Sequence, residues 1–273
     1  MNLQTLIALA LEEDLGPGDV TSEACIPADA MGRARIVAKQ DLVLSGQEAA
    51  AAMFEALGVR YERVSADGSA LTPGDVVGMA AGTVRGILIA ERHALNFLGR
   101  LSGIATWTHA HVQAAAGAFG VVDTRKTTPL HRFLEKAAVR HGGGRNHRFA
   151  LYDGVLIKDN HIIAAGSVQQ AIARAKASAH HLLRIQVEVE SLEQAHEAVE
   201  AGADALLLDN MGDDLLARVI DALKGRVMLE ASGNMDIPRI TTLAAKGIHP
   251  DQVSVGGVIH QARWVDVSLD LEA

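Results

Sequence analysis

Residues 183–209 read LRIQVEVESLEQAHEAVEAGADALLLD, and this stretch decides the predicted fold. A short, mainly apolar segment lies at each end of it, and a helical pattern lies between them. Ser191 followed by Gln194 is a capping box, which starts a helix, and Gly202 is the residue type that ends one. The stretch therefore predicts a strand, a helix and a second strand.

The same alternation extends on both sides of this unit. Gly225 and Gly247 are placed to close two further helices. Strands that alternate with helices predict a parallel sheet with right-handed crossover connections. The predicted strands are residues 121–124, 155–158, 183–189, 205–209, 227–230 and 252–255.

The predicted sheet could be open or closed into a barrel. Several strands end in a residue suited to function, namely Lys158, Glu188, Asp209, Glu230 and Ser254. In an α/β barrel such ends converge on the face that carries the chemistry. An open doubly wound sheet also gathers ligands there, but usually with a Gly-x-Gly-x-x-Gly fingerprint, which this sequence lacks. Six strands rather than eight favour an incomplete or irregular barrel.

The first part of the chain has a different pattern. Apolar residues at helical spacing predict an amphipathic helix over residues 3–11. Residues 33–84 contain short strands and one helix without a regular repeat, which is typical of an α+β domain. Residues 87–117 predict one long helical region, interrupted at Ser102-Gly103.

Composition limits the function. The chain has 273 residues, a net charge of −8, 49% hydrophobic and 3% aromatic residues. Negative charge with few stacking side chains argues against nucleic acid as a partner, so we expect a small substrate. The first apolar run has no basic segment before it, unlike a signal peptide, and none approaches the roughly 18 residues of a membrane span. With a single cysteine, Cys25, we expect a cytoplasmic protein.

Cations concentrate between residues 123 and 161. This stretch has eight Lys and Arg against four Asp and Glu, a net charge of +4 inside an acidic chain. Such a cluster predicts a local anion site, and the mixture of Arg and Lys suits a substrate with both carboxylate and phosphate groups. The alternative is a solvated loop and helix face. The cations are Arg125, Lys126, Arg132, Lys136, Arg140, Arg145, Arg148 and Lys158.

Two parts of this stretch present donors together. Arg125 and Lys126 directly follow a predicted strand, and adjacent cations repel each other unless an anion binds there. His147 and Arg148 follow the glycine triplet 142–144, where they could grip a pair of carboxylates. The alternative for the second pair is a turn with solvated side chains.

Carboxylates occupy equivalent positions in two successive strand–helix units. Glu188 and Asp209 each follow apolar residues and could hold sugar hydroxyls or a divalent cation. They could instead form a structural ion network with Lys158 and Arg125. A role in binding and a role in such a network are compatible.

Small residues follow the last two strands. Backbone N–H groups of 232–234 and 256–257 could hold a phosphate, although each segment could be only a turn. Arg92, Asn96 and Arg100 recur at i, i+4 and i+8 on one helix face, which faces either solvent or a site. The sequence offers neither a zinc motif nor an activated nucleophile.

These residues fall in motifs that resemble, in order along nearly the whole chain, those of the quinolinate phosphoribosyltransferase (decarboxylating nicotinate-nucleotide diphosphorylase) family. The matching segments are EDLGPGDVT (13–21), ERHALNF (91–97), LSGIA (101–105), DTRKTTP (123–129), GGGRNHR (142–148), LIKDNH (156–161), VEV (187–189), LLDN (207–210), EASGN (230–234) and VSVG (253–256).

The resemblance implies the architecture and the assembly. It implies an α/β fold with an N-terminal α+β sandwich domain over residues 1–104 and an incomplete, about seven-stranded α/β barrel over 105–260. The C-terminal tail, about 261–273, would pack back on the first domain. It also implies a homodimer in which each site borrows Arg92 from the neighbouring subunit, and it leaves further assembly to a hexamer open.

The resemblance also implies an enzyme of NAD biosynthesis, a pentosyltransferase that transfers phosphoribosyl to quinolinate with decarboxylation. Arg92, Arg125, His147 and Arg148 would surround the carboxylates of quinolinate. Phosphoribosyl pyrophosphate and its Mg²⁺ would face Lys126, Lys158, Glu188 and Asp209, which are the implied catalytic residues. Its 5′-phosphate would lie among Ser232, Gly233, Asn234, Gly256 and Gly257. The Mg²⁺ would be bound mainly by the substrate pyrophosphate, with Glu188 and Asp209 as the candidate protein ligands.

One short segment departs from the family pattern. The family usually continues Thr-Thr-Pro with Gly and an apolar residue, whereas Leu130 and His131 stand here. The loss of the glycine puts the conformation of this loop in question. Two alternatives to the family activity are a homologue from the molybdenum-transport-associated branch and a non-catalytic sensor of an anionic metabolite. The complete DTRKTTP and LIKDNH motifs argue against the first, and only an assay separates the second.

Overall fold

The computed structural model describes residues 2–272 and divides into two compact units. Unit 1 contains the residues up to 109, residues 127–143 and the residues from 259 onwards. Unit 2 contains residues 110–126 and 144–258. The domain boundary expected at 104/105 falls inside the long helix α4 (Val84–Ala114), which runs from unit 1 into unit 2.

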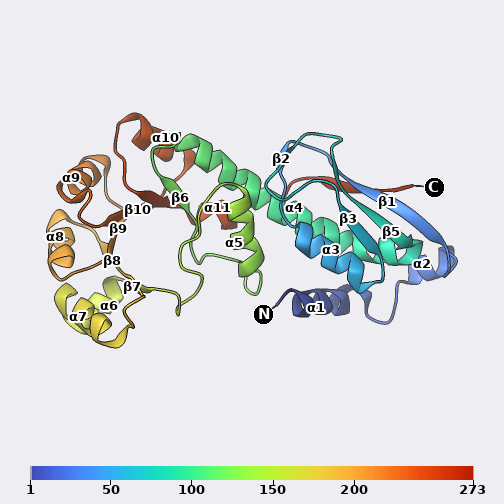
Figure 1. Cartoon of the computed structure of the whole chain (residues 1–273), viewed down its shortest axis with the longest axis horizontal. Coiled ribbons are helices and arrows are strands. Elements are labelled where there is room, and N and C mark those ends of the chain that lie inside the picture. Colours follow the sequence, from blue (N-terminus) through green and yellow to red (C-terminus); the bar gives the residue numbers. More distant parts are fainter. Residues whose placement is uncertain (1, 273) are drawn as a thin grey trace. The chain divides into compact units, whose positions relative to one another are not determined.

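Unit 2 is built on a six-stranded parallel sheet of order β6-β11-β10-β9-β8-β7. Helices α7, α8 and α9 follow one another along one face of the curved sheet (Figure 1). The strands are β6 (Gly120–Val122), β7 (Val155–Ile157), β8 (Ile185–Val189), β9 (Ala205–Asp209), β10 (Met228–Ser232) and β11 (Gln252–Ser254). The helices are α6 (Asp159–Ala165), α7 (Val168–Ser178), α8 (Leu192–Glu200), α9 (Asp213–Leu223) and α10 (Ile237–Ala245). The short helix α11 (Gly257–His260) follows β11.

All six predicted strands are present in this sheet, with ends that differ by a few residues. The stretch that decides the fold forms β8, α8 and β9, and Ser191 caps α8 by accepting a hydrogen bond from the Gln194 N–H at 3.2 Å. The resemblance implied about seven barrel strands, whereas the sheet described here has six, with β6 and β7 at its two ends. Its strands are largely buried, as expected for a parallel sheet covered by helices.

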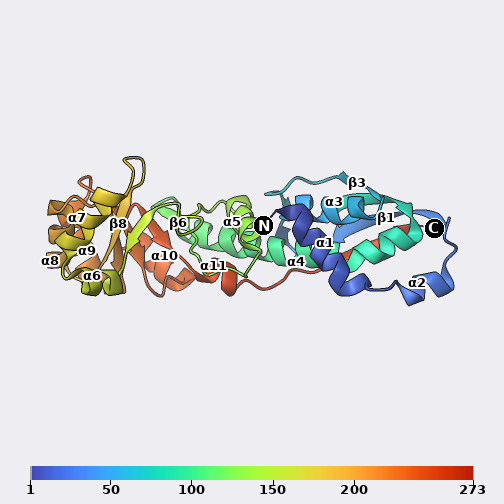
Figure 2. The same ribbon diagram turned by 90° about the horizontal axis from the view of Figure 1, so that it is seen from below.

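Unit 1 is built on a four-stranded antiparallel sheet of order β12-β1-β5-β3. The C-terminal strand β12 pairs with β1, and Figures 1 and 2 both show the C-terminus at this sheet. The strands are β1 (Met31–Ala38), β3 (Arg60–Arg63), β5 (Val76–Thr83) and β12 (Val267–Glu272), with β2 (Leu42–Val43) and β4 (Ala70–Leu71) forming a separate pair. The helices are α1 (Leu3–Leu15), α2 (Val20–Cys25), α3 (Gln47–Ala56) and α5 (Arg132–His141).

Helix α4 is continuous, so the predicted interruption at Ser102-Gly103 was wrong. The glycines of this helix serve close packing instead. A Cβ atom added to Gly103 would lie 2.1 Å from the Arg263 carbonyl oxygen, and one added to Gly99 would lie 3.0 Å from that of Val265. The Val265 N–H donates to the Gly99 carbonyl at 3.1 Å. The helix contains glycine here because the C-terminal segment crosses it at backbone contact distance.

The loop at Leu130 keeps the backbone that a glycine would adopt. Leu130 has φ 69°, in the left-handed region, and its side chain is 56% exposed. The next residue, His131, occupies the position at which the family has an apolar residue. Its ring lies beside the ring of Phe97, with 6.4 Å between the two ring centroids. Leu130 therefore bears the strain of a left-handed backbone that glycine would adopt freely.

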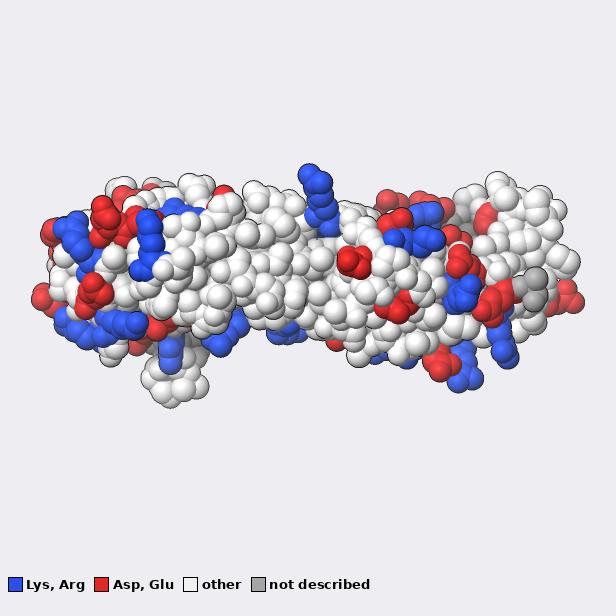
Figure 3. All heavy atoms as spheres, turned by 90° about the horizontal axis from the view of Figure 1, so that it is seen from above, with Lys and Arg blue, Asp and Glu red and all other residues white. Residues whose placement is uncertain are grey.

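Two surface properties bear on partners. On the face drawn in Figure 3, acidic and basic side chains are interspersed within each unit, whereas binding of nucleic acid favours a basic stripe. Within residues 2–272, no helix combines the length and the apolar character needed to cross a lipid bilayer.

We expect Leu130→Gly to be more stable than Leu130→Ala. Both variants remove the exposed side chain, but only glycine adopts a left-handed backbone without the penalty of about 1–2 kcal/mol for other residues. The greater backbone entropy of glycine in the unfolded chain offsets part of this gain, so a difference of about 1 kcal/mol is expected. Urea unfolding at equilibrium measures it. An alanine variant as stable as the glycine variant would show that the loop is not strained.

Candidate active site

Polar side chains share one face of the parallel sheet at its carboxyl edge. Residues paired across neighbouring strands point to the same face, as do residues two apart along a strand. Ser232 of β10 pairs with Asp209 of β9. Glu188 of β8 pairs with Leu207, which lies two residues before Asp209. The structure therefore brings Glu188, Asp209 and Ser232 to one side of the sheet, on three successive strands.

Lys158 joins this row through an ion pair. It directly follows β7, and its Nζ lies 3.3 Å from Oε2 of Glu188 on the neighbouring strand. The carboxylate is mostly buried, but the lysine side chain is about half exposed. A pair of this kind contributes about 0–1 kcal/mol to stability because water screens it. A bound anion can therefore draw Lys158 away from Glu188 at small cost.

Arg125 and Arg148 are a second set of charged side chains in unit 2. Burial first, and then the nearby charge of Arg125, lower the pKa of Arg148 from its ordinary value. The Arg148 Nη1 donates to the Gly154 carbonyl at 3.0 Å, which fixes the direction of the guanidinium. The charge of Arg125 disfavours the cation of Arg148, and a carboxylate-bearing ligand would relieve that repulsion.

A buried carboxylate holds the segment that carries His147 and Arg148. Asp123 follows β6, is fully buried, and accepts hydrogen bonds from the His147 N–H at 2.8 Å and from Asn146 Nδ2 at 2.7 Å. The Arg145 N–H donates to the Val121 carbonyl at 2.8 Å, so the segment also runs beside β6. Asp123 was not among the predicted site residues.

The hydrogen bonds of the His147 ring define its tautomer. Nδ1 accepts from the Arg148 N–H at 2.8 Å, so the ring proton is on Nε2. Nε2 donates to Gln186 Oε1 at 2.9 Å and lies 3.6 Å from Glu230 Oε2. The imidazole is thereby oriented from both of its nitrogens.

Glu230, one of the strand-end residues that the sequence analysis named, is the centre of a buried polar group whose other members, Gln186 and Gln252, were not predicted. Its side chain is 1% exposed, and Oε2 accepts from Gln186 Nε2 at 3.0 Å and from Gln252 Nε2 at 2.8 Å. Each of these three residues lies two positions before Glu188, Ser232 or Ser254 on its strand. That spacing places polar side chains on one face of otherwise apolar strands, a signal that could have identified them.

The loops after β9 and β10 combine left-handed residues with close backbone approach. Asn210, Gly233 and Asn234 have φ values of 52°, 91° and 50°. A Cβ atom at Gly233 would lie 2.1 Å from Asn210 Oδ1, so no larger residue fits. Gly256 and Gly257 lie between β11 and α11. Such segments can present backbone N–H groups to a phosphate, as predicted for Ser232-Gly233-Asn234 and for this glycine pair.

The remaining predicted residues lie on the surface of their own units. Lys126 is exposed, and its backbone N–H donates to Thr124 Oγ1 at 3.1 Å. Arg92 is exposed on α4 in unit 1, where it lines a cavity of about 350 Å³ with Asp14 and Asp19. Arg100, which was predicted to share a face with Arg92, is instead paired with Glu135.

The arrangement favours binding and electrostatic chemistry. Cations lie beside carboxylates at the edge of the sheet, and the small residues leave backbone groups accessible. Within residues 2–272, no three or more His, Cys, Asp or Glu side chains gather into a cluster that could hold a metal ion.

Comparison with family models identifies both parts of the chain. Residues 19–102 match the N-terminal domain of quinolinate phosphoribosyl transferase, and residues 104–270 match its C-terminal domain.

Related sequences give the same family. The chain is 39% identical to the probable nicotinate-nucleotide pyrophosphorylase [carboxylating] of Bacillus subtilis, over 99% of this chain and 94% of that protein. It is 36% identical to quinolinate phosphoribosyltransferase [decarboxylating] 1b of Nicotiana tabacum, over 99% of this chain and 83% of that protein.

Solved structures agree along the whole chain. NadC from Streptococcus pyogenes has a TM-score of 0.94 and 41% identity, with 99% of this chain and 96% of that chain covered. The nicotinate-nucleotide pyrophosphorylase of Ehrlichia chaffeensis has a TM-score of 0.92 and 32% identity, with 100% and 99% covered.

We expect Asp123→Ala to destabilise the protein by about 3 kcal/mol, because it removes a buried charged acceptor from two donors, on Asn146 and His147, that are themselves partly buried. The matched control is Asp153→Ala, whose exposed carboxylate also accepts a backbone N–H, from Phe149 at 2.6 Å. Water replaces that acceptor, so the control should lose less than about 1 kcal/mol. Urea unfolding compares the two. Equal losses would show that burial does not determine the importance of Asp123.

Proposed function

The chain belongs to the quinolinate phosphoribosyltransferase family, and we propose that its active site is the carboxyl edge of the β6–β11 sheet. Its relatives are named as nicotinate-nucleotide pyrophosphorylases [carboxylating] and quinolinate phosphoribosyltransferases [decarboxylating]. The chain transfers phosphoribosyl from phosphoribosyl pyrophosphate to quinolinate. The products are nicotinate mononucleotide, pyrophosphate and CO₂, as in de novo NAD biosynthesis.

In this reaction the pyridine nitrogen of quinolinate bonds to C1 of the ribose while the bond from C1 to pyrophosphate breaks. Positive charge develops on the ribose, and negative charge on the leaving pyrophosphate. The alkylated ring then accepts the electron pair of the bond to the 2-carboxylate, which leaves as CO₂, and that ring carbon takes a proton. No side-chain nucleophile is required, so the protein contributes position and electrostatic stabilisation.

Arg125 and Arg148 form the quinolinate end of the proposed site. Their mutual repulsion is relieved by a ligand with two carboxylates, and the planar guanidinium forks suit that geometry. His147 borders the same end, with its ring held by Gln186 and by the Arg148 N–H. Buried Asp123 keeps both residues beside β6.

The phosphoribosyl pyrophosphate end combines cations, carboxylates and small residues. Lys126 and Lys158 would bind pyrophosphate oxygens, with Lys158 released from Glu188. Glu188 and Asp209 then face the ribose and its hydroxyls. The 5′-phosphate would lie among the backbone N–H groups of Ser232, Gly233, Asn234, Gly256 and Gly257.

We include Mg²⁺ as the cofactor of this site. The donor set fits it, because Mg²⁺ usually binds through one or two carboxylates together with substrate phosphates and water. Glu188 and Asp209 would supply the carboxylates. When bound, Mg²⁺ neutralises charge that develops on the pyrophosphate.

The proposal also covers assembly and compartment. A homodimer would complete each site with Arg92 of the partner subunit, and the exposed position of Arg92 on α4 supports this role. We place the protein in the cytoplasm, where its one cysteine, exposed and free, would stay reduced.

The observation that carries the proposal is the row of Lys158, Glu188, Asp209 and Ser232 on one face at one edge of the sheet. The test is to mix the protein with quinolinate, phosphoribosyl pyrophosphate and Mg²⁺ and to follow nicotinate mononucleotide and CO₂ together. We expect both products in equal amounts, with turnover abolished in Lys126→Ala. Quinolinate binding without either product would identify a sensor instead of an enzyme.

We expect Arg148→Ala to raise the KM for quinolinate roughly 10- to 150-fold. The lost charge-assisted hydrogen bonds are worth about 1.5–3 kcal/mol. The KM for phosphoribosyl pyrophosphate should change by less than about threefold, since a group at one end of a site binds one substrate. Arg184→Ala is the control, because Arg184 is exposed just before the amino end of β8. An unchanged quinolinate KM in Arg148→Ala would remove Arg148 from the site.

A further inference from the structure

Glu135 of α5 is a buried carboxylate in unit 1 that the proposed reaction does not use. Its side chain is 1% exposed. Oε2 accepts from the Thr128 N–H at 2.8 Å, and Oε1 accepts from Thr128 Oγ1 at 2.8 Å and from Arg100 Nη2 at 3.1 Å. One carboxylate therefore binds Thr128 through both its backbone and its side chain.

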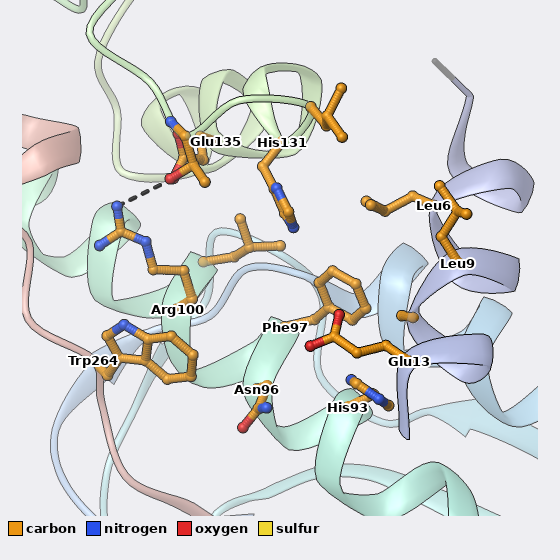
Figure 4. A pocket seen from close by; sticks show the side chains of 14 residues that line it. Leu6, Leu9, Glu13, His93, Asn96, Phe97, Arg100, His131, Glu135 and Trp264 are labelled. Carbon is orange, nitrogen blue, oxygen red and sulfur yellow. Dashed lines mark hydrogen bonds and ion pairs between the residues drawn. The ribbon is translucent and has the colours of Figure 1, made fainter. Parts of the chain in front are cut away.

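Arg100 of α4 connects this carboxylate to a second segment of unit 1. Its Nη1 donates to the Ala262 carbonyl at 2.9 Å and its Nη2 to the Ile259 carbonyl at 2.9 Å. Figure 4 shows the ion pair between Arg100 and Glu135 on one side of a cavity of about 410 Å³ that is otherwise lined mainly by apolar side chains. The Arg100 guanidinium thus donates hydrogen bonds to one carboxylate and two carbonyl groups.

The two segments held in this way directly follow two loops of the proposed site. Thr128 lies two residues after Lys126 and three after Arg125, in the loop after β6. Ile259 lies two residues after Gly257, in the segment after β11. Strands β6 and β11 are neighbours in the sheet. A single ion pair therefore fixes the chain at the exits of two adjacent site loops.

Stability alone does not account for such a pair. The Glu135 carboxylate is buried and the Arg100 side chain is 21% exposed, so the cost of desolvation offsets much of their attraction, and apolar residues often replace such an ion pair without loss of stability. What apolar residues cannot supply is the fixed direction of the hydrogen bonds to Thr128 and to the carbonyl groups of 259 and 262. Displacement of a binding group by about 1 Å can reduce activity about 100-fold.

We infer that Arg100, Glu135 and Thr128 are positioning residues for the phosphoribosyl pyrophosphate end of the site. They act through the loop that carries Lys126 and the segment that carries Gly256 and Gly257, and they touch no substrate themselves. This inference rests on the proposed function and extends it to residues outside the site.

The test compares Thr128→Val, which removes the hydroxyl and keeps the shape, with Thr128→Ser, which keeps the hydroxyl. Thr72→Val is the matched control, because the Thr72 N–H and Oγ1 also donate to one carboxylate, Asp75 Oδ2, at 2.7 and 2.9 Å in an exposed turn. Glu135→Gln removes the charge but keeps an acceptor. For each variant we would measure KM and kcat for both substrates, the affinity for phosphoribosyl pyrophosphate by calorimetry, and the unfolding midpoint.

We expect Thr128→Val to weaken phosphoribosyl pyrophosphate about tenfold, in both KM and calorimetric affinity, with a smaller rise in the quinolinate KM because Arg125 precedes Lys126 in the same loop. Thr128→Ser and Thr72→Val should bind phosphoribosyl pyrophosphate as the unmodified protein does. Glu135→Gln should weaken this binding more than Thr128→Val does. Equal behaviour of Thr128→Val and Thr72→Val, or a loss for quinolinate as large as that for phosphoribosyl pyrophosphate, would overturn the inference. Failure of the unmodified protein to form product would instead overturn the proposed function, while the calorimetric comparison would still decide the positioning role.

Discussion

The parallel direction of the β6–β11 strands is the constraint on which the candidate site depends. In a parallel sheet every strand delivers its following loop to the same edge, so residues far apart in the sequence meet without any special connection. Lys158 and Glu188 come together in this way, as do Asp209 and Ser232. A one-residue shift in the register of any strand would turn its polar side chain to the opposite face.

Buried carboxylates and exposed cations have different roles in the two units. Asp123, Glu135 and Glu230 are almost completely buried, and each accepts at least two hydrogen bonds. The cations of the proposed site, such as Arg125 and Lys126, lie on the surface. A buried charge is costly unless it is hydrogen-bonded, so Asp123 and Glu135 hold the segments that donate to them. The exposed cations keep their hydration until an anion replaces it.

The sequence predicted the parts that depend on local pattern. Apolar segments and helix caps predicted the six strands of the parallel sheet, and strand ends predicted that Lys158 and Glu188 would lie near each other. The residues it missed depend on partners that are distant in the chain. Glu135 binds Arg100 from another helix, and Gly103 faces a segment about 160 residues later. No local pattern encodes such partners, whereas Gln186 and Gln252, each two residues before a polar strand-end residue, could have been found as Glu230 was.

Leu130 shows how these distant contacts override local preference. Glycine would be the favoured residue at φ 69°, yet the turn persists with leucine. The residues on either side explain why, since Thr128 is bound by Glu135 and the His131 N–H donates to the Thr128 carbonyl at 3.1 Å. The His131 ring also lies beside Phe97. With both flanks fixed, the residue between them has no freedom to leave the left-handed region. The loop conformation is therefore set by its anchors, and the glycine of the family pattern lowers its cost without determining it.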